Sequence, residues 1–132
     1  MRILDTDVCV EILRGNSEVI SRRREIQDSV ATSWITASEL FYGAAKSAAP
    51  NDNRVLVEQL LETMDVVGVN LEVARRFGAL KATLEETGQR LADADLLIAS
   101  IALANDAILV TGNYKHYQRI PRLVTEDWIR AE

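Results

Sequence analysis

Short apolar runs alternate with helical patterns along the whole chain, and this alternation is the feature that most constrains its fold. Strands are predicted at residues 2–4, 30–35, 66–69 and 107–111, with a short last strand near Leu123. Helical patterns are predicted at residues 8–14, 17–27, 36–44, 53–64, 70–88 and 93–103, with a helical end around Trp128. Strands that alternate with helices indicate an α/β fold, in which a parallel sheet of about five strands is sandwiched between helices.

The chain is expected to form one domain over residues 1–132, because no linker rich in Pro, Gly or Ser and no repeat divides it. Its 15 Lys and Arg against 20 Asp and Glu give a net charge of −5, which argues against broad, sequence-independent binding of nucleic acid. A single cysteine, Cys9, excludes an internal disulfide and favours a reducing cytosol. A single histidine, His116, excludes most zinc sites.

The apolar segments are too short for a membrane role. Asp5 interrupts the N-terminal residues before a signal peptide could form, and the longest near-apolar run, residues 96–104, falls short of the ~20 residues that span a bilayer. We therefore expect a cytoplasmic protein without membrane contact.

Four acidic residues come just after a predicted strand or in the first turn of the following helix: Asp5, Asp7, Glu39 and Asp95. Ligands of parallel sheets bind beyond the carboxyl ends of the strands, so these side chains are expected to converge at one edge. Clustered carboxylates repel one another unless a cation neutralises them, and an all-oxygen ligand set suits Mg²⁺ or Mn²⁺. The pattern predicts a metal-assisted hydrolase, with phosphodiesters as the natural substrate class.

Each acid also has a purely structural interpretation. The pattern alone leaves a metal cluster and four separate structural roles equally open. Thr36 and Glu39 have the spacing of a capping box. Asp5 and Asp7 suit a turn or a helix cap, and Asp93 and Asp95 suit the start of a helix. Residues two apart on a helix point about 200° apart, so Asp93 and Asp95 are not expected to bind one ion together.

Four segments in order resemble the motifs of the PIN-domain ribonucleases, and among them the VapC-type toxins of toxin–antitoxin pairs. The segments lie between residues 3 and 117 and are Ile3-Leu4-Asp5-Thr6-Asp7, Ser38-Glu39-Leu40 with Gly43, Asp95-Leu-Leu-Ile-Ala-Ser100 and Val110-Thr-Gly-Asn113. The resemblance implies a single PIN-like domain with a metal-dependent endoribonuclease activity that uses Mg²⁺ or Mn²⁺. It makes the metal cluster the preferred interpretation of the acids.

The resemblance also assigns roles to individual residues. It makes Asp5 and Asp95 metal ligands, and it makes Glu39 a ligand, directly or through water, that can position the attacking water. Thr6 and Thr111 would support the site through hydrogen bonds.

Two positions depart from the family pattern. Asp7 stands where the family usually has Asn, and we expect it to cap the next helix. Asn113 stands where many members have a fourth Asp, which leaves a second metal ion uncertain, and the spacing of Asp93 argues against its compensating for the change.

The resemblance further implies a structured RNA substrate, cleaved to leave 5′-phosphate and 3′-hydroxyl ends. Arg14, Lys115 and Tyr117 are candidate substrate-binding residues, because cations and aromatic rings bind single-stranded RNA. Equally open is an interpretation of residues 114–122 as a solvated loop whose tyrosines pack on the core. The expected partners are a second copy of the chain and a VapB-like antitoxin whose C-terminal segment blocks the acidic site.

Two rival functions are kept as alternatives. Asp5-Thr6-Asp7 after a strand also fits a haloacid-dehalogenase-like phosphatase, in which the first Asp attacks phosphorus, but Glu39 would then have no role. A catalytically inactive PIN-like domain that binds only RNA or protein is the second alternative, because the fourth acid is replaced at Asn113.

Overall fold

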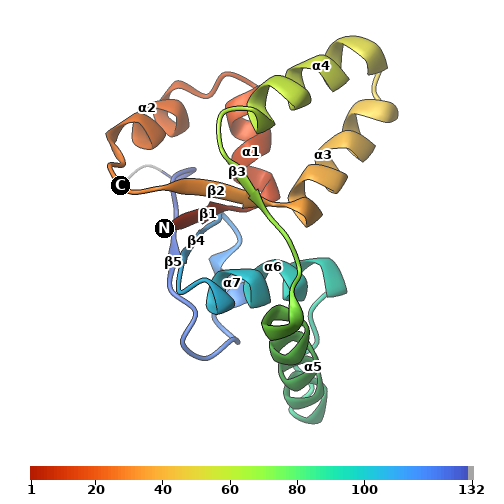
Figure 1. Ribbon diagram of the computed structural model, residues 1–132, viewed down its shortest axis with the longest axis vertical. Coiled ribbons are helices and arrows are strands. Elements are labelled where there is room, and N and C mark those ends of the chain that lie inside the picture. The colour runs from red at the N-terminus through yellow and green to blue at the C-terminus, as the bar shows by residue number, and fades with distance from the viewer. Residues whose placement is uncertain (131–132) are drawn as a thin grey trace.

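The fold is built on a five-stranded sheet in which every neighbouring pair of strands is parallel (Figure 1). A computed structural model describes residues 1–130. The strands are β1 (Arg2–Leu4), β2 (Val30–Ser33), β3 (Asp65–Val67), β4 (Ile108–Val110) and β5 (Thr125–Glu126), and their order in the sheet is β3-β2-β1-β4-β5. The parallel sheet predicted from the alternation of strands and helices is therefore confirmed.

Helices cover both faces of the sheet. They are α1 (Thr6–Leu13), α2 (Ser17–Glu25), α3 (Trp34–Ala45), α4 (Pro50–Leu61), α5 (Leu71–Glu86), α6 (Asp93–Ala104) and α7 (Tyr114–Tyr117). Figure 1 shows α1 to α4 on one side of the sheet and α5 to α7 on the other. No helix within residues 1–130 is long and apolar enough to cross a membrane.

A hydrophobic core lies on each face of the sheet, between the strands and the helices that cover that face. Each central strand contributes side chains to both cores, because its side chains alternate between the two faces. Ile3 and Leu109 pack into the core with α5 and α6, whereas Leu4 and Val110 pack into the core with α1 to α4. Successive residues of a strand point to opposite faces, so two apolar neighbours on each strand supply both cores. This explains why these short strands are apolar throughout.

The order of the strands reverses between β1 and β4, which are neighbours in the sheet but separated by most of the chain. β2 and β3 follow β1 towards one edge of the sheet, and β4 and β5 follow it towards the opposite edge. The amide of Asp5 donates to the carbonyl of Val110 at 2.9 Å, which holds the ends of β1 and β4 together. A crevice at such a reversal is where parallel α/β sheets bind their ligands.

Several element boundaries differ from the sequence predictions. The second strand ends at Ser33, and α3 begins at Trp34 because the Ser33 hydroxyl oxygen accepts the Thr36 amide proton at 3.0 Å. The predicted cap at Thr36 is therefore wrong. The fourth helix begins at Pro50 rather than at Asn53, since proline suits a first helical position.

The C-terminal part of the structure differs more from the sequence predictions. Residues 114–117 form a short helix rather than a turn, and the last strand lies at Thr125–Glu126. Trp128 lies in a bend instead of a helix, because the carboxylate of Asp127 accepts the amide protons of Ile129 and Arg130 and so ties the backbone into a local turn.

Candidate active site

Asp5 follows β1 directly, at the point where the strand order reverses, and it is 3% exposed. It is the N-cap of α1, where one carboxylate oxygen accepts the Thr6 amide proton at 2.8 Å. The other oxygen accepts the hydroxyl proton of Thr111, at the end of β4, at 2.8 Å. Burial, and then the negative charge of Asp7, raise the pKa of Asp5 to about 6 despite these two hydrogen bonds.

Thr6 links Asp5 to Glu39. Its hydroxyl donates to Glu39 Oε1 at 2.6 Å and lies 3.1 Å from the hydroxyl oxygen of Thr36. Glu39 is exposed on α3, and its carboxylate faces α1 rather than the amides at the start of its own helix. The capping-box interpretation of Thr36 and Glu39 is therefore wrong, and the structure places Glu39 beside the Asp5 segment.

Asp95 reaches the site from the first turn of α6, where it is half-buried. The hydroxyl of Tyr117 donates to Asp95 Oδ1 at 3.4 Å. Tyr117 is 1% exposed, and burial, together with the negative charges of Asp5 and Asp95, raises the pKa of its phenol well above the usual range. The phenol therefore stays neutral and acts as a donor to the acidic cluster.

Asp7 occupies the opposite side of Asp5, and it is not a helix cap. Its Oδ2 accepts the backbone amide proton of Gly112 at 2.9 Å, across 105 residues of sequence. Its Oδ1 is buried and has no hydrogen-bond partner among residues 1–130. The expectation that Asp7 caps α1 is wrong, because Asp5 already fills that position and Asp7 lies two residues further, in the first turn of α1, facing the loop after β4. Burial raises the pKa of Asp7.

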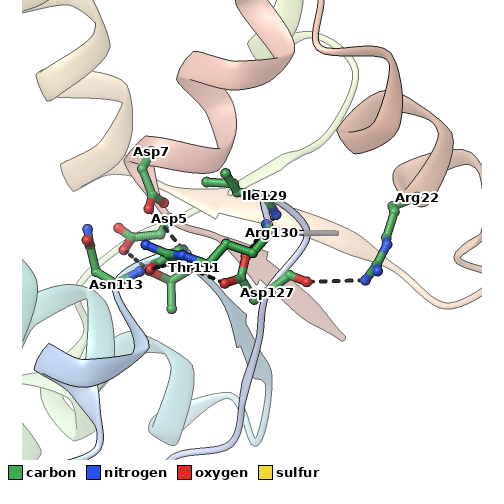
Figure 2. Close-up of polar contacts among 9 residues, drawn as sticks. Asp5, Asp7, Arg22, Thr111, Asn113, Asp127, Ile129 and Arg130 are labelled. Carbon is green, nitrogen blue, oxygen red and sulfur yellow. Dashed lines mark hydrogen bonds and ion pairs between the residues drawn. The ribbon is translucent and has the colours of Figure 1, made fainter. Parts of the chain in front are cut away.

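Thr111 and Asn113 lie beside Asp5 on this side of the site, as Figure 2 shows, and Gly112 between them contacts Asp7. The Asn113 amide donates to the hydroxyl oxygen of Thr111 at 3.0 Å, while the Asn113 side chain is exposed beside Asp5. A Cβ atom on Gly112 would stand 2.8 Å from Asp7 Oδ2 and 3.0 Å from Ile129 Cδ1. Only glycine allows this close approach of loop, α1 and C-terminal segment.

Three other residues predicted for the site lie at its margin or outside it. Asp93 is exposed and forms an ion pair with Lys81 at 3.0 Å, directed to α5 rather than to Asp95. Arg14 is exposed, pairs with Glu11 at 3.3 Å and lines a groove that also contains Thr6 and Glu39. Lys115 is exposed on α7. The buried ring of Tyr117 offers no face to a base, so the stacking role expected of it is wrong.

Two features of the site lie outside the sequence predictions. One is the hydroxyl contact of Tyr117 with Asp95. The other is the C-terminal segment, in which Arg130 Nη1 donates to the Gly112 carbonyl and to Asp127 Oδ2 (Figure 2). No local pattern marks these residues, because their partners are brought to them by the fold.

The acidic residues suit a hard divalent cation in their chemistry. All candidate ligands are carboxylate oxygens, the charges of Asp7 and Asp95 both raise the pKa of Asp5, and Asp7 contributes a buried oxygen without a partner in the described chain. Within residues 1–130, however, no three Asp, Glu, His or Cys side chains are assembled as a metal site. Each of Asp5, Glu39 and Asp95 instead accepts a hydrogen bond from a neutral neighbour.

Comparison with known proteins gives consistent matches over nearly the whole chain. A family model described as the PIN domain matches residues 2–123. "Ribonuclease VapC2" of Rickettsia felis is 33% identical over 129 residues, which cover 96% of both chains. The "tRNA(fMet)-specific endonuclease VapC" of Salmonella typhimurium is 33% identical over 127 residues, again 96% of both. The crystal structure of VapBC2 from Rickettsia felis, bound to a DNA fragment from its promoter, contains a chain that matches with a TM-score of 0.90 and 31% identity, covering 96% of this chain and 98% of that one.

Proposed function

This chain belongs to the PIN domain family, and we infer from that membership that it is a VapC-type ribonuclease, the toxin of a toxin–antitoxin pair. The single observation that carries the proposal is that Asp5, Glu39 and Asp95 come from three distant segments to the point where the strand order reverses: Thr6 joins Glu39 to the Asp5 segment, and the charge of Asp95 acts on Asp5. The reaction we propose is hydrolysis of an RNA phosphodiester bond.

We propose that Asp5 and Asp95, with Glu39 directly or through water, hold one Mg²⁺ or Mn²⁺. When bound, the cation polarises the phosphodiester and makes water more acidic. Thr111 and the Thr6 amide fix both oxygens of Asp5, and Tyr117 restrains Asp95. Asn113 borders the site as a neutral amide and Asp7 as a buried carboxylate, so both support the cluster from its edge.

Glu39 is the residue we propose as the proton acceptor. It is exposed, and among residues 1–130 only its Oε1 accepts a hydrogen bond, from the Thr6 hydroxyl. A water molecule that gives its proton to Glu39 forms a bond to phosphorus as the bond from phosphorus to O3′ breaks, and O3′ then takes up a proton. The products are a 5′-phosphate and a 3′-hydroxyl end.

The substrate we propose is a structured RNA. The name of the Salmonella typhimurium relative makes tRNA(fMet) the first substrate to test. Arg14 and Lys115 are exposed near opposite sides of the acidic site and are the side chains we propose for contacts with the phosphates that flank the cleaved bond.

The protein partner we propose is a VapB-like antitoxin, because the solved relative is a VapBC complex. A groove of about 380 Å³ runs from Glu39 and Thr6 along apolar residues of α1, α3 and α4, among them Leu13, Leu40 and Leu56. An apolar segment that ends in Arg or Lys would fit this groove and pair with the carboxylates. We also propose a homodimer, because Trp34 and Leu71 are exposed large apolar residues, 56% and 69% respectively.

The phosphatase alternative is not favoured. The match to the PIN domain covers residues 2–123, and Glu39, which would be idle in a phosphatase, lies beside the Asp5 segment. The binding-only alternative remains an outcome of the experiment that follows.

The test is cleavage of total RNA and of tRNA(fMet) by purified protein freed from any antitoxin. We expect discrete fragments with Mg²⁺ or Mn²⁺, none with EDTA, and a loss of at least 100-fold in Asp95→Asn. The matched control is Asp52→Asn, the same change at an exposed position of α4. Cleavage that survives in Asp95→Asn refutes the proposed site, and absence of cleavage under every condition supports the binding-only alternative.

A further inference from the structure

A second pocket lies against the acidic site, on the far side of the loop after β4. It has a volume of about 330 Å³ and is lined by Gly112, Asn113, Tyr114, Lys115, His116 and Arg130. That volume is at the small end of ligand pockets, about 300–1,000 Å³, and suits one nucleotide rather than a duplex. Gly112 and Asn113 lie between the pocket and the carboxylates of Asp7 and Asp5, so the pocket adjoins the acidic site across one loop.

The pocket is basic although the protein is acidic. Lys115, His116 and Arg130 line it within a chain of net charge −5. Lys115 makes no ion pair with any other residue between 1 and 130. Among residues 1–130, the one carboxylate paired with a pocket cation is that of Asp127, 3.0 Å from Arg130 Nη1, and it offsets only part of the positive charge.

Arg130 is held in place by the fold and keeps donors available. Its Nη1 donates to the Gly112 carbonyl and to Asp127, and its backbone amide donates to Asp127 Oδ1. Arg22 on α2 donates to the Asp127 carbonyl at 3.2 Å, which anchors this turn to the body of the protein. Nε and Nη2 of Arg130 make no hydrogen bond within the described chain, so they can donate to an oxyanion.

We propose that this pocket binds the nucleotide next to the cleaved bond, with its phosphate on Lys115 and Arg130 and its base on the exposed ring of Tyr114. The proposal deepens the proposed function and rests on it, because it names the part of a single-stranded RNA that the site holds. Phosphate oxygens pair with guanidinium and ammonium groups, and Tyr114 is 42% exposed, which leaves a ring face for stacking.

RNA is favoured over an acidic protein segment by the combination of groups. A carboxylate segment would use the cations but would leave the aromatic ring and the position of the pocket beside the acidic site unexplained. A polynucleotide uses all three, because it carries a phosphate and a base at every step and must continue to the scissile phosphate.

The test measures the affinity of a fluorescent single-stranded oligoribonucleotide for the full chain that carries Asp95→Asn, which prevents cleavage. Lys115→Gln is expected to weaken binding roughly tenfold, as for loss of one charged contact. It should also reduce the slope of log K against log salt by about 0.7, the value for one phosphate contact on a single strand. The matched control is Lys46→Gln, the same change at the exposed C-cap of α3, which should alter neither quantity.

Two further measurements distinguish RNA binding in this pocket from protein binding. Tyr114→Ala should weaken binding without changing the salt slope, because stacking involves no counterion. An oligoglutamate peptide is the probe for a protein partner: if Lys115→Gln weakens its binding while RNA binding is unchanged, the pocket is a protein site and the proposal is overturned. Unchanged RNA affinity and salt slope in Lys115→Gln overturn it as well.

Kinetic measurements distinguish an error in the pocket assignment from an error in the proposed ribonuclease activity. In a protein with Asp95 intact, Lys115→Gln is expected to raise KM roughly tenfold and leave kcat unchanged, because the residue binds away from the reacting atoms. Loss of metal-dependent cleavage refutes the ribonuclease, whereas intact cleavage with an unchanged KM refutes only the pocket.

Discussion

Asp5 is a carboxyl group that the fold buries next to other acids, and this has a cost in stability. Its pKa is raised from the usual 3.8 to about 6, chiefly by burial and next by the charge of Asp7. Between these two values the folded protein binds more protons than the unfolded chain. The free energy of unfolding therefore falls as the pH rises through this window, and the full loss is present above about pH 6.

We predict that Asp5→Asn stabilises the metal-free protein at pH 7, by roughly 1–3 kcal/mol, while it abolishes RNA cleavage. The gain should vanish below about pH 3, where Asp5 is protonated in both states. Thermal unfolding in EDTA between pH 3 and 8 measures the effect. Mn²⁺ should raise the midpoint of the unmodified protein and leave that of the variant unchanged; a variant that responds to Mn²⁺ like the unmodified protein would show that Asp5 is no ligand.

Tyr117 shows how a residue can serve the site without reaching solvent. We predict that Tyr117→Phe keeps the fold, because the buried ring remains, and weakens Mn²⁺ binding about fivefold, since a hydrogen bond contributes roughly 1 kcal/mol. Calorimetric titration with Mn²⁺ measures this affinity. Tyr114→Phe is the matched control at an exposed ring, and equal effects of the two changes would contradict a specific contact with Asp95.

At the scale of elements, the loop between β4 and α7 is where distant parts of the chain meet. The Gly112 amide binds Asp7 of α1, and its carbonyl binds Arg130 of the C-terminal segment. Sequence analysis predicted the strand before this loop, a hydrogen bond from Thr111 that supports the site, and the place of Asn113 near the site. It did not predict what lies against Gly112, because a close approach of three segments leaves no periodic pattern in any of them.

We predict that Gly112→Ala destabilises the protein by roughly 1–2 kcal/mol, because a methyl group at 2.8 Å from Asp7 Oδ2 forces that carboxylate and Ile129 to shift. RNA cleavage should fall with it. Gly78→Ala is the control within α5: nothing lies within 4 Å of the added methyl, so this change should stabilise the helix by about 0.5–1 kcal/mol. Urea unfolding compares the two, and similar effects would contradict the close packing at Gly112.

At the scale of the whole molecule, the described chain leaves an apolar surface at the edge of the sheet near β3. Trp34 begins α3, and the Cβ position of Gly68 would stand 3.3 Å from its Cδ1, so the indole lies over the segment that follows β3. Leu71, at the start of α5, is also exposed. These residues belong to elements on both faces of the sheet, as expected for a surface that a second copy covers.

We predict that Trp34→Glu converts a dimer into a monomer by raising the dissociation constant more than 30-fold, as expected for loss of an aromatic anchor worth at least 2 kcal/mol. Light scattering coupled to size-exclusion chromatography measures the mass. The matched control is Val124→Glu, at a residue that is 58% exposed near β5, and it should leave the mass unchanged. A mass that Trp34→Glu does not alter would refute this interface.

The sequence by itself determined the architecture and named the acids that are candidates for the site. Apolar strands that alternate with helices can bury their side chains only in a covered parallel sheet, and in such a sheet the residues after each strand share one edge. That reasoning, with the motifs that resemble the PIN domain, was enough to select Asp5, Glu39 and Asp95.

Only the tertiary structure decided how these residues are held. In the structure Ser33 caps α3, and Glu39 accepts a hydrogen bond from Thr6 instead. Asp7 contacts the amide of Gly112, and the buried Tyr117 contacts Asp95. Arg130 lies at the edge of the site, against the carbonyl of Gly112. Local patterns reflect interactions within a turn or two of helix. These contacts instead depend on which distant segments the packing of two cores places side by side, and that packing fixes burial, charge and hydrogen-bond partners together.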